Sequence, residues 1–263
     1  MVELIHKELC YDVRGVMFDV FNHLGPNLPE RFYQDAAIVG LKARGIACVA
    51  EKQFQVLYHG VEVGRYYVDI WIENGDMLAE LKVAPLLMPL HKAQAISYLK
   101  VTDADLALLV NFGQSSLVDV RLPNFVRDKR VLFHWERQTA VADRLFPDLT
   151  DELLGSCHRV HAKLGPGFFH HVYRRAIMVE LREKSIGFEF IKEMPVYYKE
   201  TRLGIQPVRL ILVEDKLLVA AVAAQTLNKM MEAQLKARMK YFNARLGLLT
   251  NFHGEKLDFA IVR

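Results

Sequence analysis

Two carboxylates and a lysine lie close together in the sequence, on either side of a tight turn. Asp69 and Glu80 flank the dipeptide Asn74-Gly75, and Lys82 follows two residues after Glu80. Asn-Gly is the strongest short-range signal for a two-residue hairpin turn, because both central residues of a type I′ turn need positive φ. Such a turn places Asp69 directly opposite Glu80, with Cβ atoms about 5 Å apart. Lys82 then projects from the same face of the sheet.

This pair of carboxylates predicts a bound cation. Like charges directly opposite each other destabilise a sheet, so a compensating positive charge is expected between Asp69 and Glu80. Carboxylate oxygens suit a hard ion such as Mg²⁺. The alternative is that Asp69 is a surface residue at the end of a strand, paired with Lys82 and binding no metal.

The elements around the hairpin predict an α/β domain with a mixed sheet flanked by helices. Apolar periodicity and turn residues predict helices over residues 11–24, 28–44 and 90–100, and strands over 47–58, the two hairpin arms, 106–112, 117–121 and 131–134. The helix over 90–100 is the single crossover in this order, so the strands that it joins are expected to run parallel.

The helix predicted over 28–44 carries Glu30 in its first turn, where the helix dipole favours an acid. On position alone, this residue is more simply a helix-terminal charge than a ligand. The apolar residues at helical spacing, which predict the buried face, are Phe32, Ala36, Val39 and Ala43. On the helix over 90–100, Gln94 and Tyr98 share one face; they could equally be ordinary residues of an amphipathic helix.

The chain repeats itself. When the sequence is shifted by 140 residues, its halves align without a gap from about residue 20 to 112: Leu24-Gly25-Pro26 meets Leu164-Gly165-Pro166, and Asn111-Phe112 meets Asn251-Phe252. This period is too long for a solenoid and indicates two copies of one domain in tandem. We expect a first domain over residues 1–122, a linker over 123–150 and a second domain over 151–263.

The second copy lacks the polar residues of the hairpin. The same shift turns Glu30 into His170, Asp69 into Arg209, Glu80 into Ala220, Lys82 into Val222 and Tyr98 into Arg238, while Gln94 persists as Gln234. Apolar positions between them stay apolar. The second copy is therefore predicted to keep the fold and to have lost the chemistry.

These residues resemble the PD-(D/E)XK nuclease superfamily. Asp69, Glu80-Leu81-Lys82 and a later helix with Gln94-x-x-x-Tyr98 follow the order of that superfamily's motif. Within it, the stretch from Asn27 to Tyr33 is similar to the name motif of the prokaryotic GxxExxY proteins, with the leading Gly replaced by Asn27. Asn also tolerates positive φ. The resemblance covers about residues 12–122, and more weakly 152–263.

The resemblance implies a site and an activity. Asp69, Glu80 and the Leu81 carbonyl would bind Mg²⁺ or Mn²⁺, with Glu30 completing the metal site. Lys82 would orient or help to deprotonate the attacking water, and Gln94 and Tyr98 would position the nucleic-acid strand. The function implied is a metal-dependent nuclease acting on DNA, with the second copy as a pseudo-dimer partner or a substrate-binding half.

Composition sets wider bounds. With 52% hydrophobic and 25% charged residues the chain reads as globular, and its net charge of +3 only permits an acidic partner. Three widely spaced cysteines match no zinc pattern and fit a reducing compartment. No apolar run reaches about 20 residues, so no membrane span is expected and a cytoplasmic location is the default. Further oligomerisation stays open.

Two other functions remain open at this point. The chain could be a non-catalytic nucleic-acid-binding or scaffold protein whose first site is a relic. It could also be an interaction module without any nucleic-acid role. The many cations of the second copy could contact phosphates, or they could be a solvated surface balanced by its glutamates.

Overall fold

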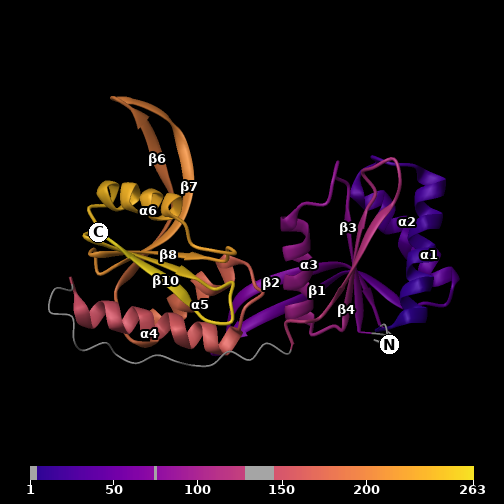
Figure 1. Ribbon diagram of the computed structural model, residues 1–263, viewed down its shortest axis with the longest axis horizontal. Coiled ribbons are helices and arrows are strands. Elements are labelled where there is room, and N and C mark those ends of the chain that lie inside the picture. Colours follow the sequence, from indigo (N-terminus) through magenta and orange to yellow (C-terminus); the bar gives the residue numbers. More distant parts are fainter. Residues whose placement is uncertain (1–4, 74–75, 128–144) are drawn as a thin grey trace. The chain divides into compact units, whose positions relative to one another are not determined.

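The computed structural model describes residues 5–73, 76–127 and 145–263. The chain divides into two compact units, Met1–Val56 with Gly64–Asp128 and Leu57–Val63 with Lys129–Arg263. Each half of the chain contributes one five-stranded mixed sheet flanked by helices, so the predicted α/β class and the tandem arrangement are confirmed (Figure 1).

The first half of the chain follows the predicted order of elements. They are α1 (Lys7–Leu24), α2 (Glu30–Ala43), β1 (Cys48–Tyr58), β2 (Val61–Ile72), β3 (Met77–Lys82), α3 (Pro89–Thr102), β4 (Leu106–Asn111) and β5 (Val118–Pro123). The strands are ordered β1-β2-β3-β4-β5 across the sheet. The strand predicted over 131–134 lies outside the described residues.

The register of the β2–β3 hairpin is the one that the Asn-Gly turn predicts. Ile70 pairs with Ala79 and Ile72 with Met77, in antiparallel strands. The turn residues 74–75 themselves lie outside the described residues. This register continues one step further to bring Asp69 opposite Glu80.

The crossover helix α3 joins β3 to β4, and these two strands are parallel, as the order of elements predicts. A parallel pair needs such a crossover, because a short turn cannot return the chain to the starting edge. In the second half, the first helix begins at Pro147. Residues 147–150, which the sequence analysis placed in the linker, are therefore helical.

The two faces of the first sheet have different partners. One hydrophobic core joins α1 and α2 to alternate sheet residues, among them Ile70, Ala79 and Leu81. The helix α3 lies on the opposite face (Figure 1). Because side chains alternate across a strand, Glu80 and Lys82 point to the α3 face, where the catalytic chemistry was expected.

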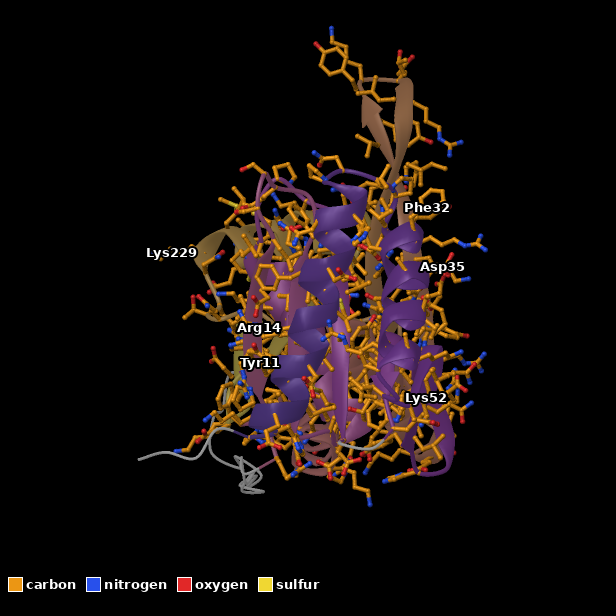
Figure 2. The ribbon with its side chains drawn as sticks, turned by 90° about the vertical axis from the view of Figure 1, so that its right-hand side faces the viewer. Tyr11, Arg14, Phe32, Asp35, Lys52 and Lys229 are labelled. Carbon is orange, nitrogen blue, oxygen red and sulfur yellow. The ribbon has the colours of Figure 1, made fainter. Side chains whose placement is uncertain are left out.

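The apolar stripe predicted for α2 is wrong. Phe32 is 57% exposed and Val39 is 69% exposed, whereas the helix buries Tyr33, Ala37 and Leu41. Figure 2 shows Phe32 and Asp35 on α2 among the exposed side chains of this unit. Tyr33 lies on the buried face because its ring stacks on Phe112 and its hydroxyl bonds to the Gly25 carbonyl and the Leu28 N–H.

The second half repeats the same order of elements. They are α4 (Pro147–Leu164), α5 (His170–Glu183), β6 (Phe188–Tyr198), β7 (Thr201–Val213), β8 (Leu217–Val222), α6 (Lys229–Tyr241), β9 (Leu246–Asn251) and β10 (Asp258–Val262). The sheet order is β10-β9-β8-β7-β6, and β8 and β9 are parallel. None of the described helices in either half is long and apolar enough to cross a membrane.

The gapless shift of 140 residues fails within β7. Val219 pairs with Ile211, whereas the equivalent Ala79 pairs with Ile70. One extra residue is inserted on β7 where its pairing with β6 steps from Leu210 to Pro207, a β-bulge. The hairpin position that faces Ala220 is therefore Leu210. The expectation that Arg209 takes the place of Asp69 is wrong, because Arg209 lies in the bulge with φ of 52°.

Positions kept in both copies have structural roles. The Tyr33 hydroxyl donates to the Gly25 carbonyl at 2.6 Å and accepts from the Leu28 N–H at 3.0 Å. Tyr173 makes the same two bonds, to Gly165 at 2.8 Å and from Phe168 at 3.0 Å. The tyrosine therefore holds the turn between two helices in each copy. This structural role explains why the second copy keeps the tyrosine although it lacks the carboxylates.

The first position of that motif also has a backbone role. Asn27 has φ of 65°, and Gly167 at the equivalent position has φ of 112°. Positive φ is easy for glycine and tolerated by asparagine. The departure from Gly in the first copy is thus compatible with the same turn.

Candidate active site

Asp69 and Glu80 meet at the centre of the first sheet. The Leu81 N–H donates to Oδ2 of Asp69 at 2.7 Å, so Asp69 reaches across the hairpin to the strand that carries Glu80. Glu80 is fully buried, and its Oε1 accepts a hydrogen bond from Nζ of Lys82 at 2.6 Å. Its Oε2 has no hydrogen-bond partner among the described residues.

Burial and a neighbouring negative charge keep Glu80 protonated when no cation is present. Burial, and after it the charge of Asp69, raises the pKa of Glu80 to about 9, although Lys82 acts in the opposite direction. Burial also raises the pKa of Asp69, while the Leu81 N–H and Lys82 lower it. Two carboxyls in one dry site cannot both ionise cheaply unless further positive charge arrives.

Lys82 is the cation of this site. Its Nζ donates to Oε1 of Glu80 and to the Leu81 carbonyl, both at 2.6 Å. Burial alone would lower the pKa of Lys82, but Glu80, Asp69 and Glu30 together raise it above its ordinary value. The side chain is therefore an ammonium ion at neutral pH, held between the carboxylates.

Glu30 reaches the site from the first turn of α2. Its Oε2 lies 4.0 Å from Nζ of Lys82, and its side chain is 44% exposed. Burial raises its pKa, Lys82 lowers it, and the charges of Asp69 and Glu51 raise it. The simpler interpretation of Glu30, as a helix-terminal charge only, does not account for its position beside Lys82.

Gln94 and Tyr98 come from α3, on the face where Glu80 lies. Nε2 of Gln94 donates to the Tyr98 hydroxyl at 2.9 Å. Burial raises the pKa of Tyr98, and the next cause is the charge of Glu80. The structure thus brings all six predicted side chains and the Leu81 backbone into one neighbourhood.

Two further residues belong to this neighbourhood and were missed from the sequence. Nε2 of Gln34 donates to Oε1 of Glu51 and to the Asp69 carbonyl, both at 2.8 Å. The charge of Glu51 also raises the pKa of Asp69 and of Glu30. Gln34 follows Glu30 by one helical turn, so it shares that residue's face, and this spacing could have found it.

The internal repeat carried a signal for both missed residues. At a shift of 140, Gln34 becomes Arg174 and Glu51 becomes Ile191. They therefore change together with the other site residues. No recognisable motif includes these positions on β1 and α2.

The donor set of the first copy fits a hard divalent cation. Asp69, Glu80 and the Leu81 carbonyl supply oxygen only, which Mg²⁺ and Mn²⁺ prefer. The unpartnered Oε2 of the buried Glu80 is the observation that such an ion would explain. Glu30 does not form a compact three-ligand group with Asp69 and Glu80. Among the described residues, three acidic or histidine side chains with ligand atoms all within 4.8 Å of one another occur at a different place.

That other group consists of His59, Glu180 and Glu183, all within the second unit. Its buried member, Glu180, already accepts hydrogen bonds from the Tyr58 hydroxyl and from Nε of Arg159, both at 2.7 Å. A metal is not needed to satisfy it. In the first copy, by contrast, Oε2 of the buried Glu80 has no hydrogen-bond partner among the described residues.

The second copy cannot hold the same ion. Leu210 and Ala220 occupy the positions of Asp69 and Glu80 in the hairpin register, and both belong to a hydrophobic core with α6. Val222 stands where Lys82 does. In the corrected register, Leu210 and not Arg209 takes the position of Asp69. The predicted loss of both carboxylates from the second copy is unchanged.

Comparisons with curated proteins and with solved structures give little information about this chain. No curated protein matches the chain. Among solved structures, one titled "Crystal structure of SSO0001" matches at 16% identity and a TM-score of 0.29, over 44% of this chain. The chain spans 62% of the length of that structure. So low a TM-score carries no argument about fold or function.

The family comparison is decisive, because its two matches together cover most of the chain. The sequence model of the PD-(D/E)XK nuclease superfamily matches residues 7–122 and again residues 147–263. Each match spans one set of helices and one sheet. The chain therefore belongs to the PD-(D/E)XK nuclease superfamily, as a tandem duplication of its domain.

Proposed function

We propose that the first copy is a metal-dependent nuclease that hydrolyses phosphodiester bonds in DNA, and that its name motif makes it a GxxExxY-type member of the superfamily. The observation that carries this proposal is the fully buried Glu80, which lies opposite Asp69 and whose Oε2 has no partner in the described part of the chain. A fold alone needs no such pair. A buried carboxylate without a full set of partners is costly, and function is the usual reason for keeping one.

Asp69, Glu80 and the Leu81 carbonyl are the groups that would hold Mg²⁺ or Mn²⁺, with Glu30 supplementing them. When bound, the ion would polarise a phosphoryl oxygen and lower the pKa of a water molecule. Its positive charge also favours the ionised form of Glu80, which burial and Asp69 otherwise keep protonated.

Lys82 supplies a second positive charge at a fixed place. Because Glu80 and the Leu81 carbonyl both accept from its Nζ, the ammonium is oriented before any substrate arrives. A preorganised cation stabilises negative charge that develops on a phosphorane-like transition state. We assign to Lys82 the orientation of the attacking water and this electrostatic role.

Gln94 and Tyr98 would contact the nucleic-acid strand next to the carboxylates. The Gln94–Tyr98 hydrogen bond fixes their relative position on α3. DNA rather than RNA, and a cytoplasmic location, are expectations that follow from the family resemblance. Three buried free cysteines fit a reducing compartment of that kind.

The test is cleavage of labelled single- and double-stranded DNA and RNA by the full chain, with Mg²⁺, Mn²⁺ or EDTA. We expect cleavage of DNA with either metal and none in EDTA. Asp69→Asn and Lys82→Ala should abolish it, whereas the matched surface variants Asp35→Asn and Lys42→Ala should not. Cleavage that survives both site variants would overturn the assignment of the site.

A different outcome would favour a relic site. If the wild-type chain binds nucleic acid in a salt-dependent way but cleaves none of the substrates with either metal, the protein is a non-catalytic nucleic-acid-binding member of the superfamily. Cleavage of RNA alone would keep the site and correct the substrate.

A further inference from the structure

The second copy has a cavity at the place of its lost active site. It has a volume of about 460 Å³ and is lined by the N-terminal part of α5, the bulge of β7, the end of β8 and Arg238 of α6. Its polar lining is basic: His170, Arg174, Arg209 and Arg238. All four belong to the second unit, so the cavity is complete within it.

Arg174 is the unusual member of this set. It is 5% exposed, and its Nε has no hydrogen-bond partner among the described residues. Its guanidinium lies 5.2 Å from the centre of the Phe190 ring, a contact that supplies no acceptor. A guanidinium remains charged in proteins, so a buried one with an unpartnered N–H calls for an anion.

The charged neighbours of Arg174 destabilise its positive charge further. Burial lowers the pKa of Arg174 most, and the positive charges of Arg209 and Arg175 add to this effect, bringing it to about 10. No carboxylate acts in the opposite direction on this group. The ordinary partner of a buried arginine, an aspartate or glutamate, is thus missing within the described part of the chain.

Arg209 is directed toward the same cavity by an irregularity of β7. It is the residue of the β-bulge with φ of 52°, a conformation that a side chain-bearing residue seldom adopts. Bulges commonly re-aim a side chain next to a functional site. The β2–β3 hairpin keeps the register that its turn predicts, whereas β7 is shifted by one residue against β8.

The change from the first copy replaces acidic and neutral side chains by basic ones at several matching places. Glu30 becomes His170, Gln34 becomes Arg174 and Tyr98 becomes Arg238, while Glu80 becomes Ala220. A site that merely decays loses its charges and fills with apolar side chains. Here carboxylates leave and arginines enter the same cavity.

We propose that this cavity binds a phosphate group, held by the guanidinium groups of Arg174, Arg209 and Arg238. Arginine is suited to phosphate because its planar fork donates two parallel hydrogen bonds to two oxygens. The lining of the cavity indicates a phosphate group and does not depend on which molecule carries it. That the phosphate belongs to a nucleic-acid backbone rather than to a free nucleotide rests on the nuclease function proposed above.

The test uses the full chain in EDTA, so that no cleavage occurs and a failure of the nuclease proposal does not affect it. A fluorescein-labelled oligothymidylate reports binding by anisotropy, and inorganic phosphate and thymidine monophosphate serve as competitors and as ligands in thermal denaturation. Arg174→Gln and Arg209→Gln are compared with Arg202→Gln, an exposed arginine on the same strand that lies outside the cavity.

We expect each cavity variant to weaken binding at least about tenfold, the effect of losing one charge-assisted hydrogen bond, and the control to change it much less. If inorganic phosphate and the mononucleotide compete only weakly with oligothymidylate, the site binds a nucleic-acid backbone. Stronger binding of the mononucleotide assigns it to a free nucleotide.

Stability separates a ligand site from a structural role. If Arg174 is there for phosphate, Arg174→Gln should keep or raise the melting temperature without ligand, because a buried charge is removed. A lower melting temperature with unchanged binding would show that Arg174 is structural. Cavity variants that bind all three probes as tightly as the Arg202→Gln control would overturn the proposal.

Discussion

Nζ of Lys82 lies 2.6 Å from Oε1 of Glu80, and the two residues are separated by a single position on β3. Side chains two apart on a strand share a face, so their meeting follows from the strand itself. The pairing leaves one oxygen of a fully buried carboxylate for a further partner. The chemistry of the first copy depends on what that partner is.

Loss of the charge of Asp69 or of Lys82, which both lie beside Glu80, should remove catalysis while the fold persists. For Asp69→Asn and Lys82→Ala we expect DNA cleavage to fall by at least about 100-fold, since each removes a preorganised group near the developing charge. Rates are measured under single-turnover conditions with Mn²⁺, alongside circular dichroism of each variant. A loss of less than about threefold in both would contradict the proposed roles.

The stability of the metal-free protein should fall as pH rises, because of Glu80. Its folded pKa of about 9 lies above the unfolded value near 4.3, so the folded state binds the extra proton between these limits. Stability from this group is complete below about pH 4 and is lost progressively as pH rises toward 9.

Glu80→Gln should remove that dependence. Between pH 5 and 8 the penalty of Glu80 can grow by up to about 4 kcal/mol, at about 1.4 kcal/mol per pH unit, and glutamine does not titrate. Urea unfolding in EDTA at both pH values gives the difference between variant and wild type. The raised pKa of Glu80 would be contradicted if the difference in unfolding free energy between Glu80→Gln and wild type did not increase with pH.

Divalent metal should stabilise the wild-type chain through the same groups. A ligand that binds only the folded state at 100 times its dissociation constant adds about 2.7 kcal/mol. We expect Mn²⁺ to raise the melting temperature of the wild type and of Asp35→Asn, and to leave Asp69→Asn and Glu80→Gln nearly unchanged. An equal rise in all four would place the ion somewhere else.

The tyrosines shared by both copies should act on stability and not on chemistry. Tyr33→Phe removes the hydroxyl that joins the Gly25 carbonyl to the Leu28 N–H, at a cost of about 1–3 kcal/mol. Tyr173→Phe should cost a similar amount in the second unit, since it makes the same bonds.

The control for this pair is Tyr11→Phe, because Tyr11 is 75% exposed and should change stability by less than about 0.5 kcal/mol (Figure 2). Unfolding free energies and single-turnover cleavage rates are measured for all three. A Tyr33→Phe protein that is as stable as wild type but cannot cleave DNA would make Tyr33 a site residue instead.

The site was largely predictable because its core is local in sequence. Asp69, Glu80 and Lys82 sit on one hairpin, whose register a two-residue turn dictates over the few residues on either side. Gln34 and Glu51 were missed because they reach the site from α2 and β1, and only packing of distant elements brings them to Asp69. The spacing of Gln34 from Glu30 places both on one helix face, but it does not show that this face meets Glu51 and Asp69.

The sequence by itself determined the duplicated α/β architecture, the hairpin register and the loss of carboxylates from the second copy. These depend on turn chemistry, on side-chain periods and on the repeat. Tertiary structure decided that α2 buries Tyr33 and not Phe32, and that a bulge moves Leu210 opposite Ala220 and sets Arg209 beside a cavity. The physical reason is that a strand's register is fixed by its neighbours, so one inserted residue changes every pairing beyond it.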